Sequence, residues 1–225
     1  MPLNPNVDVL NVSQRSPEWW TARVGRVTSS KCDAIFTKGR KKGEESVQRR
    51  DYRLELVCGQ ITGRPAEDMD AYKGPWVERG KALEAEARAA YEARFACMVW
   101  TPGFLAHRTL KVGSSLDGVV GNFERVLEFK VPKPATHLRW IRAGQVLPEE
   151  YESQVLMHFD VSGAPVTDFV SYCPDMPSAI QLHVVTVQRP SMDLFVAGVS
   201  EFLQEVEKER LDVLKLIDAA IAKAA

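Results

Sequence analysis

The sequence lacks the features that would place it in a membrane or in a disulfide-stabilised secreted fold. No apolar run reaches the roughly 18 residues that a membrane-spanning helix needs, and residues 1–6 contain no basic segment followed by an apolar one. The 4 cysteines are scattered, with no Cys-x-x-Cys pair, so neither a zinc site nor a disulfide framework is indicated. We therefore expect a cytoplasmic protein with reduced cysteines and no membrane partner.

The sequence also lacks the signatures of several enzyme classes. It contains no Gly-x-Ser-x-Gly elbow, no Gly-x-x-x-x-Gly-Lys phosphate loop and no His-x-His or His-Glu-x-x-His pattern. These absences argue against a serine hydrolase, a P-loop enzyme and a zinc protease. The 4 histidines are isolated along the chain, and we expect them to be structural: His107, His137, His158 and His183.

The net charge is low, −1 at pH 7, whereas nucleic-acid-binding domains usually carry a basic excess. The average hides a polarised distribution, because basic residues gather between positions 38 and 53 and acidic residues crowd positions 201–218. A solvated loop and a solvated helix face explain these runs equally well unless they lie beside a catalytic site. The basic residues are Lys38, Arg40, Lys41, Lys42, Arg49, Arg50 and Arg53.

A length of 225 residues with 45% hydrophobic content suffices for one α/β domain, which we expect to span residues 1–225. Segments between residues 97 and 131 have the pattern of an antiparallel meander, and the order of elements predicts a mixed sheet flanked by helices. The predicted helices cover residues 17–23, 31–36, 45–61, 75–94, 137–142, 149–161 and 192–224, and the predicted strands cover residues 97–100, 104–107, 112–120, 125–131, 166–172 and 183–188.

Three residues on neighbouring predicted strands form the minimal set for metal-assisted cleavage of a phosphodiester bond: Asp117, Glu128 and Lys130. Asp117 lies among apolar strand formers, and strand alternation places Glu128 and Lys130 on one face of the next strand. Two carboxylates can hold Mg²⁺, which prefers oxygen ligands, while the lysine ammonium steadies an attacking hydroxide or the charge on the phosphate.

Each part of this set also has an ordinary structural interpretation. An Asp-Gly pair such as Asp117-Gly118 is most often a hairpin turn. Glu128 and Lys130 fit an amphipathic edge strand with both charges in water. The second interpretation leaves the apolar surroundings of Asp117 unexplained.

A third carboxylate is predicted to face the sheet, because Glu84 falls within the inward stripe of the helix at 75–94. A carboxylate in that position is costly unless a cation or donors meet it. Arg88, four residues later, provides a weak surface pair; alternatively, Glu84 reaches toward a metal held by Asp117 and Glu128. The other members of the stripe are Trp76, Gly80, Leu83, Ala87 and Tyr91.

An ordered series of short blocks resembles the phage lambda exonuclease family, also described as viral recombinases or alkaline exonucleases. No single block is specific to the family. The ordered series of blocks, with a spacing close to that of the family, is specific, and it covers most of the chain. The blocks are Trp20-x-x-Arg23-x-Gly25-x-x-Thr28-Ser29-Ser30, residues 51–63, Gly80-Lys81-x-x-Glu84-x-x-Ala87-Arg88, Ser115-Leu116-Asp117-Gly118, Leu127-Glu128-Phe129-Lys130 and Tyr151-x-x-Gln154.

The resemblance implies a restriction-endonuclease-like core and a role for each site residue. Asp117 and Glu128 would be the Mg²⁺ ligands, with Mn²⁺ able to substitute and one or two ions bound. Glu84 would be a further acid, and Lys130 would position or activate the water. Gln154 would hydrogen-bond that water or the lysine. A pocket for the 5′ phosphate would be formed by Arg23, Ser30 and Ser115.

The function implied by the resemblance is Mg²⁺-dependent 5′-to-3′ digestion of one strand of linear duplex DNA from 5′-phosphorylated ends. The product would be a 3′ single-stranded overhang for phage-type homologous recombination. The resemblance also implies a homotrimeric ring, a single-strand annealing partner, phage or prophage origin, and helices at 17–62 that contribute to binding the DNA end. The alternatives are an endonuclease or junction resolvase on the same core and a DNA-binding module without activity.

Overall fold

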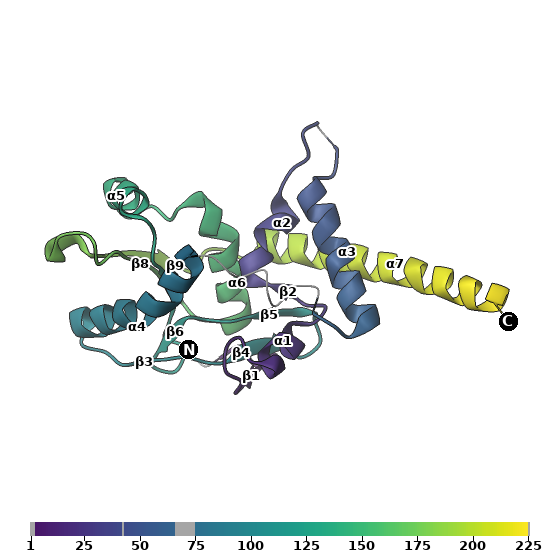
Figure 1. The fold of residues 1–225 in the computed structure, drawn as a ribbon, viewed down its shortest axis with the longest axis horizontal. Helices are drawn as coiled ribbons and strands as arrows, with labels where there is room; N and C mark the ends of the chain where they lie inside the picture. The colour runs from purple at the N-terminus through teal and green to yellow at the C-terminus, as the bar shows by residue number, and fades with distance from the viewer. Residues whose placement is uncertain (1–2, 42, 66–74, 225) are drawn as a thin grey trace.

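The computed structural model describes residues 3–41, 43–65 and 75–224, without the side chains of residues 75–77 and 81. The predicted inward position of the Trp76 side chain therefore lies outside the described residues. Helices surround two sheets, and the C-terminal helix extends from the body (Figure 1). The strands are β1 Val7–Leu10, β2 Val27–Thr28, β3 Val99–Trp100, β4 Phe104–His107, β5 Val112–Ser114, β6 Gly118–Val120, β7 Arg125–Lys130, β8 Val166–Tyr172 and β9 Leu182–Gln188. The α-helices are α1 Pro17–Arg23, α2 Asp33–Phe36, α3 Val47–Thr62, α4 Pro75–Phe95, α5 Pro134–Ala143, α6 Glu152–Ser162 and α7 Asp193–Ala224.

Local capping explains where the N-terminal helices begin and end. The Ser16 hydroxyl accepts the N–H of Trp19 at 3.2 Å, and Pro17 occupies the first turn of α1. Ser46 caps α3 in the same way, and Gly63 ends it in the left-handed conformation with φ 65°. The helix predicted at residues 31–36 is shorter than expected, because a 3₁₀ turn, η1 Ser29–Lys31, precedes the single turn of α2.

The strands form two sheets, with the orders β1-β4-β5-β2 and β3-β6-β7-β8-β9. β7 and β8 pair in parallel, whereas the other pairs of the five-stranded sheet are antiparallel. A parallel pair needs a long crossover, which here carries α5 and α6. The mixed sheet flanked by helices is confirmed, but β1 and β2 were not predicted.

The predicted meander is wrong, because its strands belong to different sheets. The strand expected at residues 112–120 breaks at Ser115, Leu116 and Asp117, with β5 in one sheet and β6 in the other. Asp117-Gly118 is therefore not a hairpin turn. Gly118 has no positive φ; a Cβ there would come within 2.5 Å of the Val99 side chain, so close packing requires the glycine.

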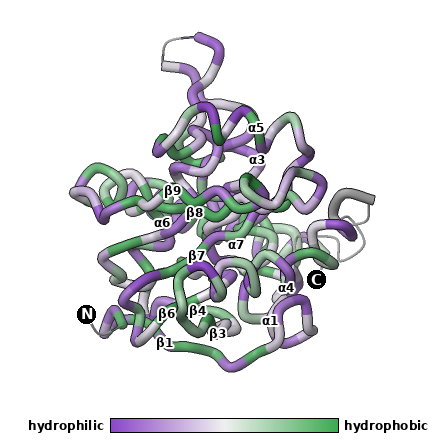
Figure 2. Tube along the Cα trace, turned by 90° about the vertical axis from the view of Figure 1, so that its left-hand side faces the viewer, coloured by the Kyte–Doolittle hydropathy of each residue, from purple (hydrophilic) through white to green (hydrophobic). Residues whose placement is uncertain are grey.

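Helix α6 joins the two sheets, since it contacts β4 and β5 of one and β7 and β8 of the other. The Leu127 and Phe129 side chains of β7 pack with Ala87 and Tyr91 of α4. Strands β8 and β9 are coloured as hydrophobic through much of their length in Figure 2. Strand β7 thus lies third of five strands with helices packed on it, and it is not an edge strand.

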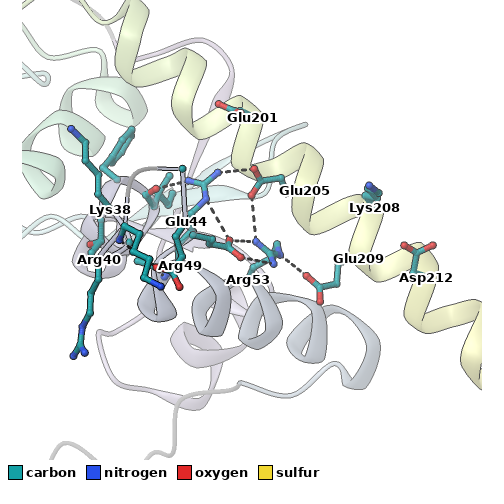
Figure 3. A pocket seen from close by; sticks show the side chains of 18 of the residues that line it. Lys38, Arg40, Glu44, Arg49, Arg53, Glu201, Glu205, Lys208, Glu209 and Asp212 are labelled. Atoms are coloured by element: carbon teal, nitrogen blue, oxygen red, sulfur yellow. Dashed lines mark hydrogen bonds and ion pairs between the residues drawn. The ribbon is translucent and has the colours of Figure 1, made fainter.

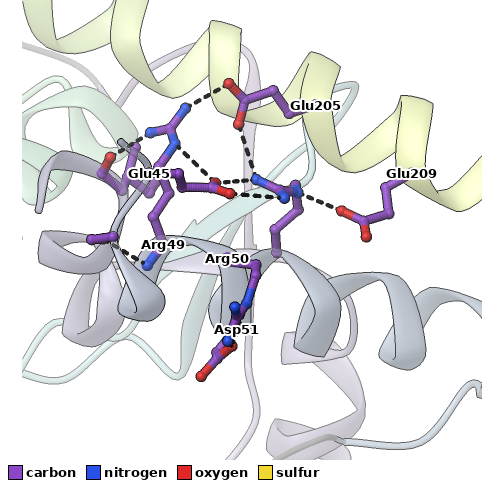
Figure 4. A network of polar contacts seen from close by, with 9 residues as sticks. Glu45, Arg49, Arg50, Asp51, Glu205 and Glu209 are labelled. Atoms are coloured by element: carbon purple, nitrogen blue, oxygen red, sulfur yellow. Dashed lines mark hydrogen bonds and ion pairs between the residues drawn. The ribbon is translucent and has the colours of Figure 1, made fainter. Parts of the chain in front are cut away.

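Helix α7 neutralises part of the basic segment. Arg49 Nη2 lies 2.9 Å from Glu205 Oε1, and Arg53 forms ion pairs with Glu45, Glu205 and Glu209 (Figure 4). The polarised charges seen along the sequence therefore meet within the fold. These two arginines hold α7 against α3 and are not a free surface for DNA.

A groove of about 1220 Å³ lies between α7 and the segment that follows α2 (Figure 3). Its lining includes Lys38, Arg40, Glu205 and Glu209 but not Asp117, Glu128 or Lys130. Lys42 lies outside the described residues. The basic segment is thus built into a different part of the molecule from the candidate catalytic residues.

None of the described helices combines the length and the apolar character needed to cross a membrane.

Candidate active site

The break between the two sheets brings Asp117 to β7. Asp117 Oδ2 accepts the backbone N–H of Phe129 at 2.8 Å, and Phe129 lies between Glu128 and Lys130 in the strand. Lys130 Nζ in turn donates to Glu128 Oε1 at 2.5 Å. The two carboxylates and the ammonium therefore meet at the junction of the sheets, as strand alternation predicted for Glu128 and Lys130.

Burial makes this cluster electrostatically unusual. The Glu128 side chain is 3% exposed, so the interpretation of an edge strand with this charge in water is wrong. Burial and the nearby charge of Glu128 raise the pKa of Asp117 to about 7, against the opposing effects of Lys130, the Phe129 N–H and Arg88. Asp117 and Glu128 repel each other as carboxylates, and a bound cation would relieve that repulsion.

The raised pKa predicts how the stability of the protein without divalent cations depends on pH. The pKa of Asp117 is higher in the folded chain than its ordinary value of 3.8, so the folded state binds the proton more tightly than the unfolded state does. The resulting stabilisation is present below pH 3.8 and is lost as the pH rises toward 7. We expect the free energy of unfolding in urea with EDTA to fall over this window. Asp117→Asn should flatten this part of the profile, and equal slopes for both proteins would contradict the raised pKa.

The donor set fits a hard divalent cation. Glu128 Oε2 is buried and has no hydrogen-bond partner, and an unpaired buried carboxylate oxygen is costly unless a cation or donor meets it. Among the described residues, no three His, Cys, Asp or Glu side chains converge closely enough to hold a metal. Glu84 is therefore not a third ligand in this arrangement. Two carboxylates suit Mg²⁺, which usually retains water and binds substrate phosphate as well.

Lys130 is held as a cation. Its Nζ lies 4.8 Å from the centre of the Tyr151 ring, a favourable cation–π distance. Burial lowers the pKa of Lys130, but the charges of Glu128 and Asp117 outweigh this effect and raise it above its ordinary value. An ammonium in this position donates hydrogen bonds.

Glu84 pairs weakly with Arg88 and lies near the acidic cluster. Its carboxylate lies 3.9 Å from Arg88 Nη2 as a weak i,i+4 pair. Burial, followed by the charge of Asp117, raises the pKa of Glu84, so it lies within electrostatic reach of the cluster. Arg88 also donates to the backbone carbonyl of Asp117 at 3.0 Å, which ties α4 to the break between the sheets.

Gln154 lies on α6. It is half-buried, and among the described residues no hydrogen bond joins it to Asp117, Glu128 or Lys130. Its neighbour one helical turn later is His158, whose Nε2 lies 3.4 Å from Glu128 Oε2. The expectation of structural histidines holds for His137, which contacts Ser171 and the carbonyl of Ile180, but His158 faces the site. The only signal in the sequence for the position of His158 was its spacing of four residues from Gln154.

The three residues assigned to the 5′-phosphate pocket also come together. Arg23 Nη2 lies 3.4 Å from Thr28 Oγ1 and 3.5 Å from Ser30 Oγ. Its guanidinium stacks 4.2 Å from the centre of the Trp19 ring, and Trp19 Nε1 donates to Ser115 Oγ at 2.8 Å. Ser115 is two residues from Asp117, so this cluster and the acidic cluster adjoin.

The segment before α1 borders both clusters and was not identified from the sequence. Gln14 Nε2 donates to the carbonyl of Leu116 at 3.3 Å. Arg15 follows with φ 70°, an uncommon conformation for a residue with a side chain, and its charge acts on Glu84. Only the fold places this segment beside residues 115–117.

Residues 18–165 match the YqaJ-like viral recombinase domain. The chain belongs to this family. The matched range contains the residues of both clusters, and the family agrees with the resemblance to lambda-type exonucleases seen in the sequence. A comparison with curated proteins finds no match.

Solved structures support the YqaJ-like assignment and show the restriction-endonuclease-like fold. The alkaline exonuclease LHK-Exo from Laribacter hongkongensis is 28% identical with a TM-score of 0.77, and the match covers 93% of this chain and all of that one. The same exonuclease in complex with dAMP is 29% identical, with the same TM-score and coverage. A phage-related exonuclease from Haemophilus somnus 129PT, 11% identical with a TM-score of 0.62 over 85% of this chain and 96% of that one, shares the fold.

Proposed function

We propose that this YqaJ-like domain is a DNA nuclease that digests one strand of linear duplex DNA in the 5′-to-3′ direction from 5′-phosphorylated ends. The product is a 3′ single-stranded overhang for phage-type homologous recombination. The observation that carries the proposal is the meeting of Asp117, Glu128 and Lys130 at the sheet junction, with a buried carboxylate oxygen that lacks a partner. The full-length match to an exonuclease supports it.

Asp117 and Glu128 would hold Mg²⁺, or Mn²⁺ in its place, and Glu84 would add a negative charge nearby. When bound, the cation polarises the phosphate and lowers the pKa of water. The residues of the chain orient and stabilise: the Lys130 ammonium would donate to an incoming water or to the phosphate oxygens, and Gln154 would hydrogen-bond that water or the lysine. Lys130 would thereby position or activate the water.

The cluster of Arg23, Ser30 and Ser115 would bind the terminal 5′ phosphate. A guanidinium backed by an indole ring and flanked by hydroxyls suits an anion with several acceptor oxygens. Ser115 lies two residues from Asp117, so this pocket would set the distance between the 5′ end of the strand and the cleaved bond. The helices at 17–62 would thereby contribute to binding the DNA end.

The same proposal includes a homotrimeric ring around the DNA, a single-strand annealing protein as partner, and a phage or prophage gene acting in the bacterial cytoplasm. These parts rest on the family resemblance. Sedimentation of the purified chain, and digestion of long duplexes against excess competitor DNA, would test the ring and the processivity that it confers.

The deciding experiment is digestion of end-labelled linear duplex DNA carrying 5′-phosphate or 5′-hydroxyl ends, with closed circular DNA alongside. We expect Mg²⁺-dependent loss of the 5′-phosphorylated strand and no cleavage of the circle. Cleavage of closed circles would indicate an endonuclease or resolvase, and DNA binding without any released nucleotide would indicate an inactive module.

Arg23→Ala is expected to reduce the rate ratio between 5′-phosphate and 5′-hydroxyl ends by roughly 10-fold or more, since a hydrogen bond to a charged group contributes about 1.5–3 kcal/mol. Digestion of 5′-hydroxyl ends should change much less. Arg50→Ala is a matched control, because Arg50 is an exposed arginine paired with Asp51. An unchanged ratio in Arg23→Ala would remove Arg23 from the pocket.

A further inference from the structure

His158 is a fully buried polar side chain whose Nε2 faces the Glu128 carboxylate. The residue is 0% exposed, and neither ring nitrogen has a hydrogen-bond partner among the described residues. Its Nε2 lies 3.4 Å from Glu128 Oε2, which is itself buried and unpaired. A buried donor and a buried acceptor rarely remain unpaired, so two of them facing each other require an explanation.

The position of Glu128 decides which ring nitrogen of His158 carries the proton. A neutral imidazole has one N–H, on either Nδ1 or Nε2. A proton on Nε2 provides a donor for Glu128 Oε2. A proton on Nδ1 would instead point the Nε2 lone pair at a carboxylate oxygen. The charge of Glu128 therefore selects the Nε2–H tautomer.

We propose that His158 is a positioning residue for the metal-binding carboxylate: its Nε2–H donates to Glu128 Oε2 while Lys130 donates to Oε1. Each carboxylate oxygen keeps a second lone pair that can face a cation, and the two hydrogen bonds limit rotation about a torsion that is otherwise broad. The distance of 3.4 Å is long for a hydrogen bond, and such contacts commonly tighten when a site is loaded. This inference rests on the proposed function of Asp117 and Glu128.

The position of His158 explains why it acts on Glu128 and not on DNA. The residue is 0% exposed, so the imidazole reaches no substrate. Partners that orient a metal-binding carboxylate typically contribute 10- to 100-fold to metal affinity. The effect of losing His158 should therefore appear first in metal binding and only through it in cleavage.

The test measures Mn²⁺ binding to the purified full chain without DNA, from the electron paramagnetic resonance signal of free Mn²⁺. We expect His158→Leu to raise the dissociation constant about 10-fold or more, and to raise similarly the Mg²⁺ concentration for half-maximal digestion. His158→Gln, whose amide nitrogen can take the place of Nε2, should remain close to the unmodified protein. His137→Leu, which removes the other fully buried histidine, should lower the melting temperature without changing Mn²⁺ affinity.

Equal Mn²⁺ affinity in His158→Leu and the unmodified protein would overturn the role of His158, as would a His158→Gln variant as weak as His158→Leu. If the leucine variant does not fold, His158→Asn replaces it, since its shorter amide cannot reach Glu128 and should show the same loss. An unmodified protein that neither binds Mn²⁺ nor digests DNA would instead contradict the proposed function. The two failures are thus distinguishable.

Discussion

Asp117→Ala is expected to abolish digestion of linear duplex DNA while leaving DNA binding intact. The substitution removes one of the two carboxylates at the sheet junction and the acceptor of the Phe129 N–H. The loss of activity should be much larger than the roughly 10- to 100-fold loss that follows when an outer partner of a metal ligand is removed. Acid-soluble nucleotide release measures cleavage, and fluorescence anisotropy of a labelled duplex with Ca²⁺ measures binding.

Two further variants separate chemistry from folding. Asp117→Asn retains an acceptor for the Phe129 N–H but not the negative charge, so it should fold normally and remain inactive. Glu86→Ala removes another acid from α4, one that contacts Tyr172, and should retain activity. Metal-dependent digestion by Asp117→Asn at the unmodified rate would disprove the assignment of this residue.

Arg125→Leu is expected to lower the free energy of unfolding by about 3 kcal/mol, because removing one partner of a buried ion pair leaves the other charge uncompensated. Arg125 Nη1 lies 2.6 Å from Asp168 Oδ1, and the Asp168 side chain is 0% exposed. Tyr91 and Thr186 still donate to Asp168 in the variant, which limits the loss. Urea denaturation followed by circular dichroism measures it.

A surface pair of similar geometry provides the control. Arg108 lies 2.9 Å from Asp8, but both side chains are more than half exposed, so Arg108→Leu should change stability by less than about 1 kcal/mol. Adding Asp168→Asn to Arg125→Leu should recover part of the lost stability, since no charge is then buried. Equal losses for Arg125→Leu and Arg108→Leu would show that burial of Asp168 does not matter.

Much of the secondary structure was predictable because its signals are local. Helix α1 and strand β8 occupy the predicted residues, and α3, α4, α6 and α7 differ at their ends by a few residues. Capping serines, apolar spacing and flanking glycines act within one or two turns of the chain. The short strands β1 and β2 were missed because they depend on β4 and β5 for their hydrogen bonds.

The candidate site was predictable in its residue types and only partly in its arrangement. Alternation along one strand correctly paired Glu128 with Lys130, because that relation is local. The contact of Asp117 with the Phe129 N–H requires a break that sends β5 and β6 to different sheets, and the sequence pattern predicted one strand there. His158 and Gln14 lie at the site because distant segments of the chain pack together. No local spacing in the sequence predicts that packing.

The set of Asp117, Glu128 and Lys130, the helical periodicity and the family resemblance were determined by the sequence alone, since each depends on composition or on short spacings. The tertiary structure decided which charges are buried. It paired Arg49 and Arg53 with α7, which removes them from any DNA surface, and it enclosed Glu128 between Lys130 and His158. Burial determines the strength of a charge interaction, and burial is a property of the whole fold.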